Sequence, residues 1–307
     1  MSEPLKPEGY PITIDRDTRI IPAAAEVFKA PRATGEAAPL SIKELTAMAK
    51  SIRRHVLQMT FAASSGHPGG SLSETEIVTA LYFHVMRHNP ASPKWEDRDR
   101  FILSKGHACP ALYAALAEAG YFPVEELLTF RRINSRIQGH THIMTPGIEM
   151  SAGSLGQGLS FGIGAALAGR LDKKGYRVYV LLGDGECDEG QVWEAAMAAA
   201  HYKLDNITAI VDRNRIQNDR FTSQAMEIEP FAAKWRAFGW SVQEINGHSF
   251  RQIIHAVDQA QKVKERPSVI IAHTVKGKGV SFMENNPSFH GKPPTKEELD
   301  KALQELA

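Results

Sequence analysis

The sequence predicts an α/β fold, with a mostly parallel sheet and helices on both of its faces. An apolar, β-branched run at residues 177–182 indicates a buried strand, a helical pattern covers about 188–204, and a second buried strand covers 207–211. Two strands joined through a helix are expected to be parallel, with a right-handed crossover. Apolar runs also alternate with helical segments before and after this unit, which favours the same architecture throughout.

The first 40 residues differ from the rest of the chain, because prolines interrupt every potential helix or strand. Residues 1–40 are therefore predicted to form an extended arm or a disordered leader. The isoleucines at 12–14 and 20–21 suit packing against another surface. Residues 41–307 are predicted to form the folded domain.

Two capping boxes mark helix starts in the first part of this domain. Ser41 and Glu44 have the required spacing, and so do Ser73 and Glu76, which predicts a second helix over 73–86. The other expected elements are strands at 101–104, 240–245 and 267–272, and helices at 42–63, 111–119, an arginine-rich segment before 139, a Gly- and Ala-rich segment ending near 170, 231–238, 250–264 and the C-terminus.

The composition is that of an ordinary globular protein. The chain has 307 residues, of which 43% are hydrophobic and 23% are charged, and its net charge is +1. Because there is no long basic run, nucleic acid is not expected as a partner. No apolar run reaches transmembrane length and no signal peptide is evident, so no membrane partner and a cytoplasmic location are expected. The two cysteines, Cys109 and Cys187, match neither a disulfide framework nor a zinc knuckle.

Polar residues follow both strands of the central unit. Gly183, Asp184 and Gly185 come directly after the first strand, and Asn214 follows the second. The carboxyl ends of neighbouring parallel strands meet at one edge of the sheet, where α/β folds bind ligands. Carboxylate and amide oxygens suit Mg²⁺ or Ca²⁺, and Mg²⁺ often shares its ligands with phosphates. A lone Gly-Asp-Gly is more often a simple turn, but the helix start near Asp188 favours an anion, so this unit is predicted to hold a diphosphate through a divalent cation.

Four histidines lie in glycine-flanked segments that are expected to be loops at strand ends or helix starts. They are His67, His107, His140 and His290. Loops on a rigid scaffold are where functional residues concentrate, and a histidine can donate to an oxyanion, move a proton or bind phosphate. A zinc site built on His140 and His142 is the competing interpretation, but no further histidine or cysteine pair completes it.

The order of the motifs resembles that of transketolase. The chain contains in turn SGHPGG, LSKGH, GHT, AGSLGQG, GDG and DRNRIQ. The last two, a GDG followed after a helix and a strand by asparagine, resemble the thiamine diphosphate motif. The resemblance covers about residues 41–307 and only the amino-terminal, diphosphate-binding part of that enzyme. It therefore implies a thiamine diphosphate-binding fold and the amino-terminal subunit of a split transketolase.

The resemblance also implies roles for individual residues. The metal, Mg²⁺ or Ca²⁺, would be held by Asp184, Asn214 and the carbonyl of Ile216. The residues implied to contact thiamine diphosphate are His67, His107, Gly153, Leu155, Gly183, Asp184, Gly185, Glu186, Asn214, Ile216 and His290. The residues implied in catalysis are His67, His140 and His290 near the thiazolium and the sugar, and Glu189 in a carboxylate network at the dimer interface.

Partners are implied in the same way. In this family a pyrimidine-binding domain supplies the glutamate that activates the cofactor, and a C-terminal domain follows it. The chain is therefore expected to transfer a two-carbon ketol unit between sugar phosphates, such as from xylulose 5-phosphate, only with a second polypeptide that carries both domains, as two copies of each chain. The alternatives are a relative of deoxyxylulose-phosphate synthase, favoured by the VKGKG loop at 275–279, the α-type subunit of a 2-oxoacid dehydrogenase, and a non-catalytic regulatory subunit.

Overall fold

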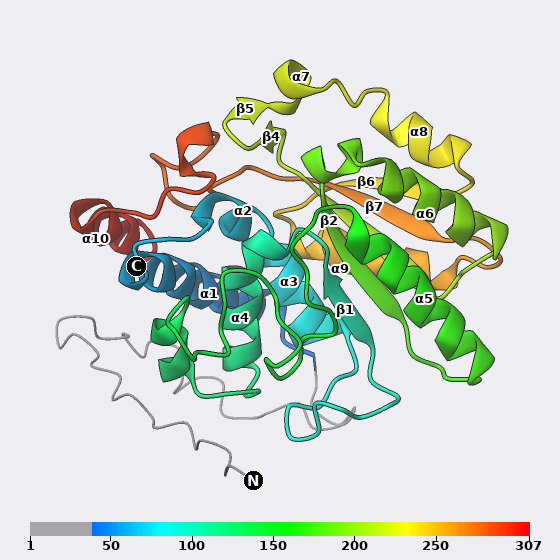
Figure 1. Cartoon of the computed structure of the whole chain (residues 1–307), viewed down its shortest axis with the longest axis horizontal. Helices are drawn as coiled ribbons and strands as arrows, with labels where there is room; N and C mark the ends of the chain where they lie inside the picture. Colours follow the sequence, from blue (N-terminus) through cyan, green and yellow to red (C-terminus); the bar gives the residue numbers. More distant parts are fainter. Residues whose placement is uncertain (1–38) are drawn as a thin grey trace, which may run out of the picture.

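Figure 1 shows the computed structural model of the chain, in which residues 39–307 are described. A five-stranded sheet lies at its centre, and every pair of neighbouring strands is parallel. The strand order across the sheet is β1 (Arg100–Leu103), β2 (Val178–Gly183), β3 (Ile207–Arg213), β7 (Ser268–His273) and β6 (Ser241–Asn246). The predicted α/β fold is confirmed, together with the parallel strand–helix–strand unit at its core.

Helices cover both faces of this sheet (Figure 1). One face is covered by α5 (Gln157–Leu171), α6 (Gly190–His201) and α8 (Phe231–Ala237). The other is covered by α1 (Ile42–Ala62), α3 (Thr75–Ala80), α4 (Cys109–Glu118) and α9 (Phe250–Lys262). Each face has its own apolar cluster, because alternate residues of a strand point to opposite sides.

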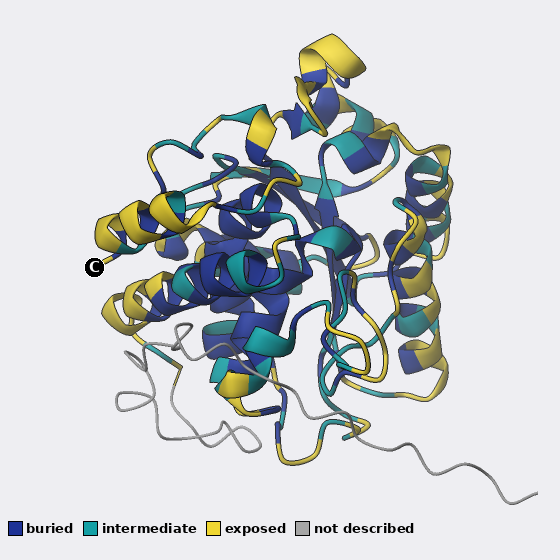
Figure 2. Cartoon of the chain, turned by 60° about the vertical axis from the view of Figure 1, so that its left-hand side comes forward, coloured by how far each residue is buried: buried dark blue, intermediate teal, exposed yellow. Residues whose placement is uncertain are grey.

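Strand β2 illustrates this division. Val180 packs in the cluster beneath α5 and α6, whereas Tyr179 and Leu181 pack in the cluster beneath α1 and α4. Helix α5 approaches the sheet so closely that a β-carbon at Gly162 would lie 2.5 Å from Val180 Cγ2. The absence of a side chain at Gly162 is therefore required for this packing. Figure 2 shows the resulting pattern, with buried strands at the centre and exposed outer faces on the peripheral helices.

Short elements connect this framework. They are α2 (Pro68–Ser73), a π-helical turn (Leu81–Val85), 3₁₀ turns at Gly106–Ala108, Val124–Thr129, Gly185–Asp188 and Pro287–Phe289, the hairpin β4 (Ile216–Gln217) and β5 (Arg220–Phe221), α7 (Thr222–Ala225) and the C-terminal α10 (Lys296–Glu305). The β4–β5 hairpin and α7 were not predicted, since strands of two residues leave no detectable period.

One of the two predicted capping boxes is correct. Ser41 Oγ accepts from the N–H of Glu44, and the Glu44 carboxylate accepts from the N–H of Ser41. The second, at Ser73 and Glu76, is wrong, and the single helix expected over 73–86 is divided into α2, α3 and the π-helical turn. The hydroxyl of Ser73 donates to the carbonyl of Gly70 and to Asp212 instead of accepting from the backbone N–H of Glu76. Tertiary contacts have therefore replaced the local cap.

The arginine-rich segment before Gly139 is also not helical. Its only helical part is the 3₁₀ turn that ends at Thr129, and the following residues form turns. Arg131 and Asn134 have φ angles of 60° and 65°, which interrupt a right-handed helix.

The arm predicted at residues 1–40 lies outside the described residues except for its last two. Of these, Leu40 is anchored to the domain, since its N–H donates to the carbonyl of Phe83 at 3.1 Å. Over residues 39–307, no helix combines the length and apolar character needed to cross a membrane.

Candidate functional site

A cavity of about 290 Å³ opens at the carboxyl edge of the sheet. Its walls come from the loops that follow β1, β2 and β3, from the start of α2, and from the segments around residues 140, 153, 276 and 290. Twelve of the residues singled out from the sequence line it: His67, His107, His140, Gly153, Leu155, Gly183, Asp184, Gly185, Glu186, Asn214, Ile216 and His290. Segments up to 223 residues apart in the chain, at His67 and His290, thus form one site.

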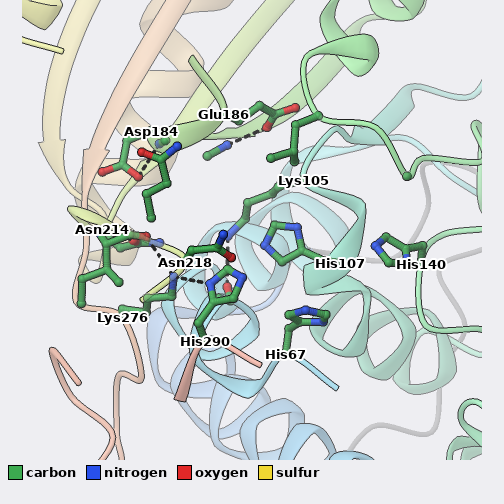
Figure 3. A pocket seen from close by; sticks show the side chains of 17 residues that line it. His67, Lys105, His107, His140, Asp184, Glu186, Asn214, Asn218, Lys276 and His290 are labelled. Carbon is green, nitrogen blue, oxygen red and sulfur yellow. Dashed lines mark hydrogen bonds between the residues drawn. The ribbon is translucent and has the colours of Figure 1, made fainter. Parts of the chain in front are cut away.

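The histidines gather on one side of this cavity, across from Asp184 and Glu186 (Figure 3). The His67 ring is central, with its centroid 5.1 Å from that of His107, 5.3 Å from His290 and 6.3 Å from His140. The Nδ1 atom of His67 is buried without a hydrogen-bond partner. A buried polar atom without a partner, on a residue that lines a cavity, calls for an explanation such as an unfilled ligand contact.

The four imidazoles are held in the neutral form. Burial, together with nearby cationic groups that include Lys276, lowers the pKa of His67 to about 4 and that of His290 to about 3. Burial likewise lowers the pKa of His107 well below its usual value, and that of His140 below it. Neutral imidazoles can both donate and accept protons, so these side chains are available for proton transfer at neutral pH.

These pKa shifts predict how stability depends on pH. Above about pH 6.5 the histidines are neutral in both the folded and the unfolded chain, so they contribute no pH dependence. As the pH falls from there toward 4, the unfolded chain binds protons that the folded site does not, and stability decreases. We expect Tm to fall over this range, and to fall by a few degrees less in His67→Asn. The measurement is thermal unfolding from pH 4 to 7, with His201→Asn, at the exposed end of α6, as the matched control. Identical Tm profiles for His67→Asn and the wild type would contradict a lowered pKa at His67.

The loop after β2 is fixed by its own carboxylates. Asp184 Oδ1 accepts from the N–H of Gly185 at 2.8 Å, and its Oδ2 accepts from the N–H of Arg215 at 2.6 Å. Glu186 Oε2 accepts from the N–H of Gly183 at 2.9 Å, and Oε1 accepts from the N–H of Gly156 at 2.9 Å. Although Glu186 lines the cavity, both of its oxygens are thus engaged in joining two loops of the site.

An oxygen donor set for a divalent cation is present at this edge. It consists of the carboxylate of Asp184, the amide oxygen of Asn214 and the carbonyl of Ile216, all of which line the cavity. The Ile216 carbonyl already accepts a hydrogen bond from the ammonium of Lys276, which shows that this oxygen is presented to a cation. The donor chemistry fits Mg²⁺ or Ca²⁺, with the remaining positions open to phosphate oxygens. Residues 39–307 contain no group of three or more His, Cys, Asp and Glu side chains arranged to hold a metal.

Two lysines of the cavity were missed by the sequence analysis. Lys105 and Lys276 are 2% and 3% exposed, yet both line the cavity. Lys276 Nζ lies 2.9 Å from the Ile216 carbonyl and 2.8 Å from His290 Nδ1, and its burial, with Lys105 nearby, lowers its pKa to about 8 (Figure 3). Their positions in the sequence could have indicated that they belong to the site, since Lys105 lies in SKGH beside His107 and Lys276 lies in VKGKG after a predicted strand.

Two other residues considered from the sequence lie outside this cavity. Glu189 precedes α6, is exposed, and packs its β-carbon beside Gly156. An exposed position suits the predicted role of Glu189 at a dimer interface, and that role stays a prediction. His142 is exposed, and its Nδ1 accepts from the N–H of Met144 at 3.3 Å. His142 therefore does not join His140 in the cavity.

The fold and the site together define an α/β chain with a pocket lined by polar residues at the carboxyl edge of its parallel sheet, where such folds bind ligands. Residues 45–307 match the family model described as "Transketolase, thiamine diphosphate binding domain". The chain belongs to the transketolase family, and the predicted resemblance is confirmed.

Individual relatives agree with this assignment. The chain is 46% identical to the 6-deoxy-6-sulfo-D-fructose transketolase subunit SqwG of Clostridium sp., over 86% of this chain and 96% of the relative. It is 42% identical to an apulose-4-phosphate transketolase subunit of Phocaeicola vulgatus, over 87% and 95% of the two chains. The crystal structure of transketolase from Campylobacter jejuni is similar with a TM-score of 0.82 and 34% identity, over 87% of this chain and 43% of that one. The chain is thus a transferase chain that corresponds to the amino-terminal subunit of a split transketolase.

Proposed function

We propose that this chain binds thiamine diphosphate with a divalent cation and forms one half of the active site of a two-chain transketolase. The observation that carries this proposal is the convergence of the Asp184, Asn214 and Ile216 oxygens with four neutral histidines in one cavity. Asp184, Asn214 and Ile216 would hold Mg²⁺ or Ca²⁺. Lys276 and His107 line the same cavity and can contact the diphosphate. Gly185 cannot be replaced without a shift of its neighbour, since a β-carbon there would lie 2.8 Å from the Gln217 side chain.

When bound, thiamine diphosphate supplies the carbon nucleophile and the electron sink that cleavage of a ketose requires. The chain's own residues then have two tasks. His67, His140 and His290 exchange protons with the hydroxyls of the sugar and donate to its alkoxide oxygens, because each is neutral and borders the cavity. Leu155 and Gly153 form the wall on which the cofactor ring would rest.

A second polypeptide is the expected partner. The relatives that this chain covers almost completely are each named as one subunit of a transketolase, whereas the chain spans 43% of the Campylobacter jejuni transketolase. The partner would carry the pyrimidine-binding and C-terminal domains, and with them the group that activates the cofactor. We propose two copies of each chain, with every active site formed between a chain of each kind.

The sugar is the least constrained part of the proposal. The two subunit relatives are named for 6-deoxy-6-sulfo-D-fructose and for apulose 4-phosphate, and neither name refers to xylulose 5-phosphate. These names favour a ketose with an anionic end as the donor, with xylulose 5-phosphate as one member of a set to be tested.

The test is reconstitution. The purified chain and a candidate partner chain would be assayed separately and together, with thiamine diphosphate and Mg²⁺, for ketol transfer from xylulose 5-phosphate, apulose 4-phosphate and 6-deoxy-6-sulfo-D-fructose to an aldose phosphate. We expect turnover only in the mixture. Turnover by the chain alone would refute the need for a partner. Cofactor binding without turnover of any donor, in an assembled complex, would favour the regulatory alternative.

A further inference from the structure

A buried carboxyl group that the proposed reaction does not use lies directly behind the cavity wall. Glu74 stands between α2 and α3 and is 0% exposed. Its Oε2 lies 2.9 Å from Lys105 Nζ, and apart from this ion pair neither oxygen of Glu74 has a hydrogen-bond partner. A fully buried carboxylate without hydrogen bonds is strongly disfavoured.

Asp212, the second carboxyl group next to the Lys105 ammonium, differs from Glu74 because it accepts several hydrogen bonds. Asp212 accepts from Lys105 Nζ at 2.5 Å, from Ser73 Oγ at 2.5 Å, from Asn214 Nδ2 at 3.0 Å and from Thr274 Oγ1. Burial alone would raise the pKa of Asp212, but Lys105 and these hydrogen bonds lower it below its usual value. Asp212 is therefore the ionised partner of Lys105.

Glu74 is then the group that carries a proton. Burial raises the pKa of Glu74 to about 8. The negative charge of Asp212 adds to this increase, and the positive charge of Lys105 opposes it. The thiol of Cys109 on α4 also interacts with Glu74, and burial keeps that thiol neutral by raising its pKa. With Glu74 protonated, the set Glu74–Lys105–Asp212 has no net charge; with Glu74 ionised, it carries one negative charge.

This charge lies close enough to the cavity to interact electrostatically with an anionic ligand there. Lys105 borders the cavity, and its ammonium also donates to the carbonyl of Gly70 at 3.1 Å, another residue of the cavity wall. An added negative charge behind Lys105 would cancel the attraction that this lysine offers to a diphosphate. Hydrogen bonds and the ion pair hold Lys105 in place, so it acts mainly through its charge.

We propose that Glu74 is a positioning residue whose protonated form behind Lys105 favours anion binding, so that at alkaline pH an anionic cofactor binds with uptake of a proton at this carboxyl group. The proposal rests on the proposed function, because thiamine diphosphate is the anion considered. It predicts weaker cofactor binding as the pH rises, through a residue that does not touch the cofactor.

The experiment compares the wild-type chain with its Glu74→Gln variant, each assembled with the partner chain. Glutamine keeps the shape of the neutral acid and cannot ionise. Titration calorimetry with thiamine diphosphate and saturating Mg²⁺, between pH 6.5 and 9 and in two buffers of different ionisation enthalpy, gives both the affinity and the protons taken up. We expect equal affinities at pH 6.5 and roughly tenfold tighter binding by Glu74→Gln at pH 9, with less proton uptake. Lys276 also titrates in this range, and its contribution should persist in both proteins.

Glu118→Gln is the matched control, since Glu118 is a buried carboxyl on α4 that contacts Ser51 and His55 and does not line the cavity. Equal proton uptake at pH 9 by the wild type and Glu74→Gln would overturn the proposal. Infrared spectroscopy of the ligand-free chain provides a second test, because a carboxylic acid band at pH 7 must disappear in Glu74→Gln, and its absence from the wild type would also overturn the proposal. Failure of the wild type to bind thiamine diphosphate would instead refute the proposed function, a result distinct from either of these.

Discussion

Replacing Asp184 by asparagine is expected to weaken the binding of Mg²⁺ and thiamine diphosphate by at least roughly a hundredfold, since even residues outside the first coordination sphere contribute 10- to 100-fold. Asparagine keeps one oxygen, which can accept from the N–H of Gly185 or from that of Arg215 but not from both, and it removes the only carboxylate of the proposed metal site. The loss should therefore appear in binding more than in folding. Arg213, 3.3 Å from Asp184 in the buried ion pair, would keep its contact with Glu229.

Calorimetric titration of Mg²⁺ in the presence of thiamine diphosphate, together with thermal unfolding of the free protein, separates these two effects. Asp172→Asn, at the exposed end of α5, is the matched control and should bind as the wild type does. Wild-type affinity in Asp184→Asn would show that Asp184 is not a metal ligand. A large decrease in Tm with unchanged affinity would assign Asp184 to the structure of the loop.

Replacing His67, His140 or His290 by alanine is expected to reduce kcat by roughly 10²- to 10⁴-fold, the usual range for loss of a proton-transfer group. Cofactor affinity should change much less, because the proposed metal ligand Asp184 lies across the cavity from these histidines (Figure 3). The measurements are kcat, KM and the dissociation constant of thiamine diphosphate in the reconstituted two-chain enzyme.

His142→Ala is the natural control, since His142 is exposed, lies two residues from His140 and is not part of the cavity. It should retain wild-type turnover, and it also tests the zinc interpretation, in which His140 and His142 act together. Unchanged kcat in all three cavity variants would show that these histidines take no part in proton transfer. Equal losses of kcat and cofactor affinity would assign them to binding.

Some features of the fold and the site could be predicted from local sequence, whereas others depend on tertiary contacts. The unit β2–α6–β3 was predictable because buried strands are short, apolar and β-branched and because a strand–helix–strand connection permits one topology. Asp184 and Asn214 were predictable for the same reason, since each follows a strand and the ends of parallel strands meet. The prediction of a single helix over 73–86 was wrong because the Ser73 hydroxyl, which was expected to cap that helix, donates instead to Asp212, 139 residues away in the sequence.

The sequence by itself determined the fold class and the edge of the sheet that forms the site, because these depend on local periodicity and on glycine-rich loops at strand ends. Twelve of the 17 residues that line the cavity were singled out from the sequence, some of them, such as Leu155 and Ile216, only through the resemblance to transketolase. Only the tertiary structure decided which charges meet behind that cavity. Lys105 and Asp212 are 107 residues apart, and the ammonium of Lys276 reaches the Ile216 carbonyl across 60 residues. The charge state of Glu74 depends on burial and on long-range pairing, which leave no pattern in the neighbouring sequence.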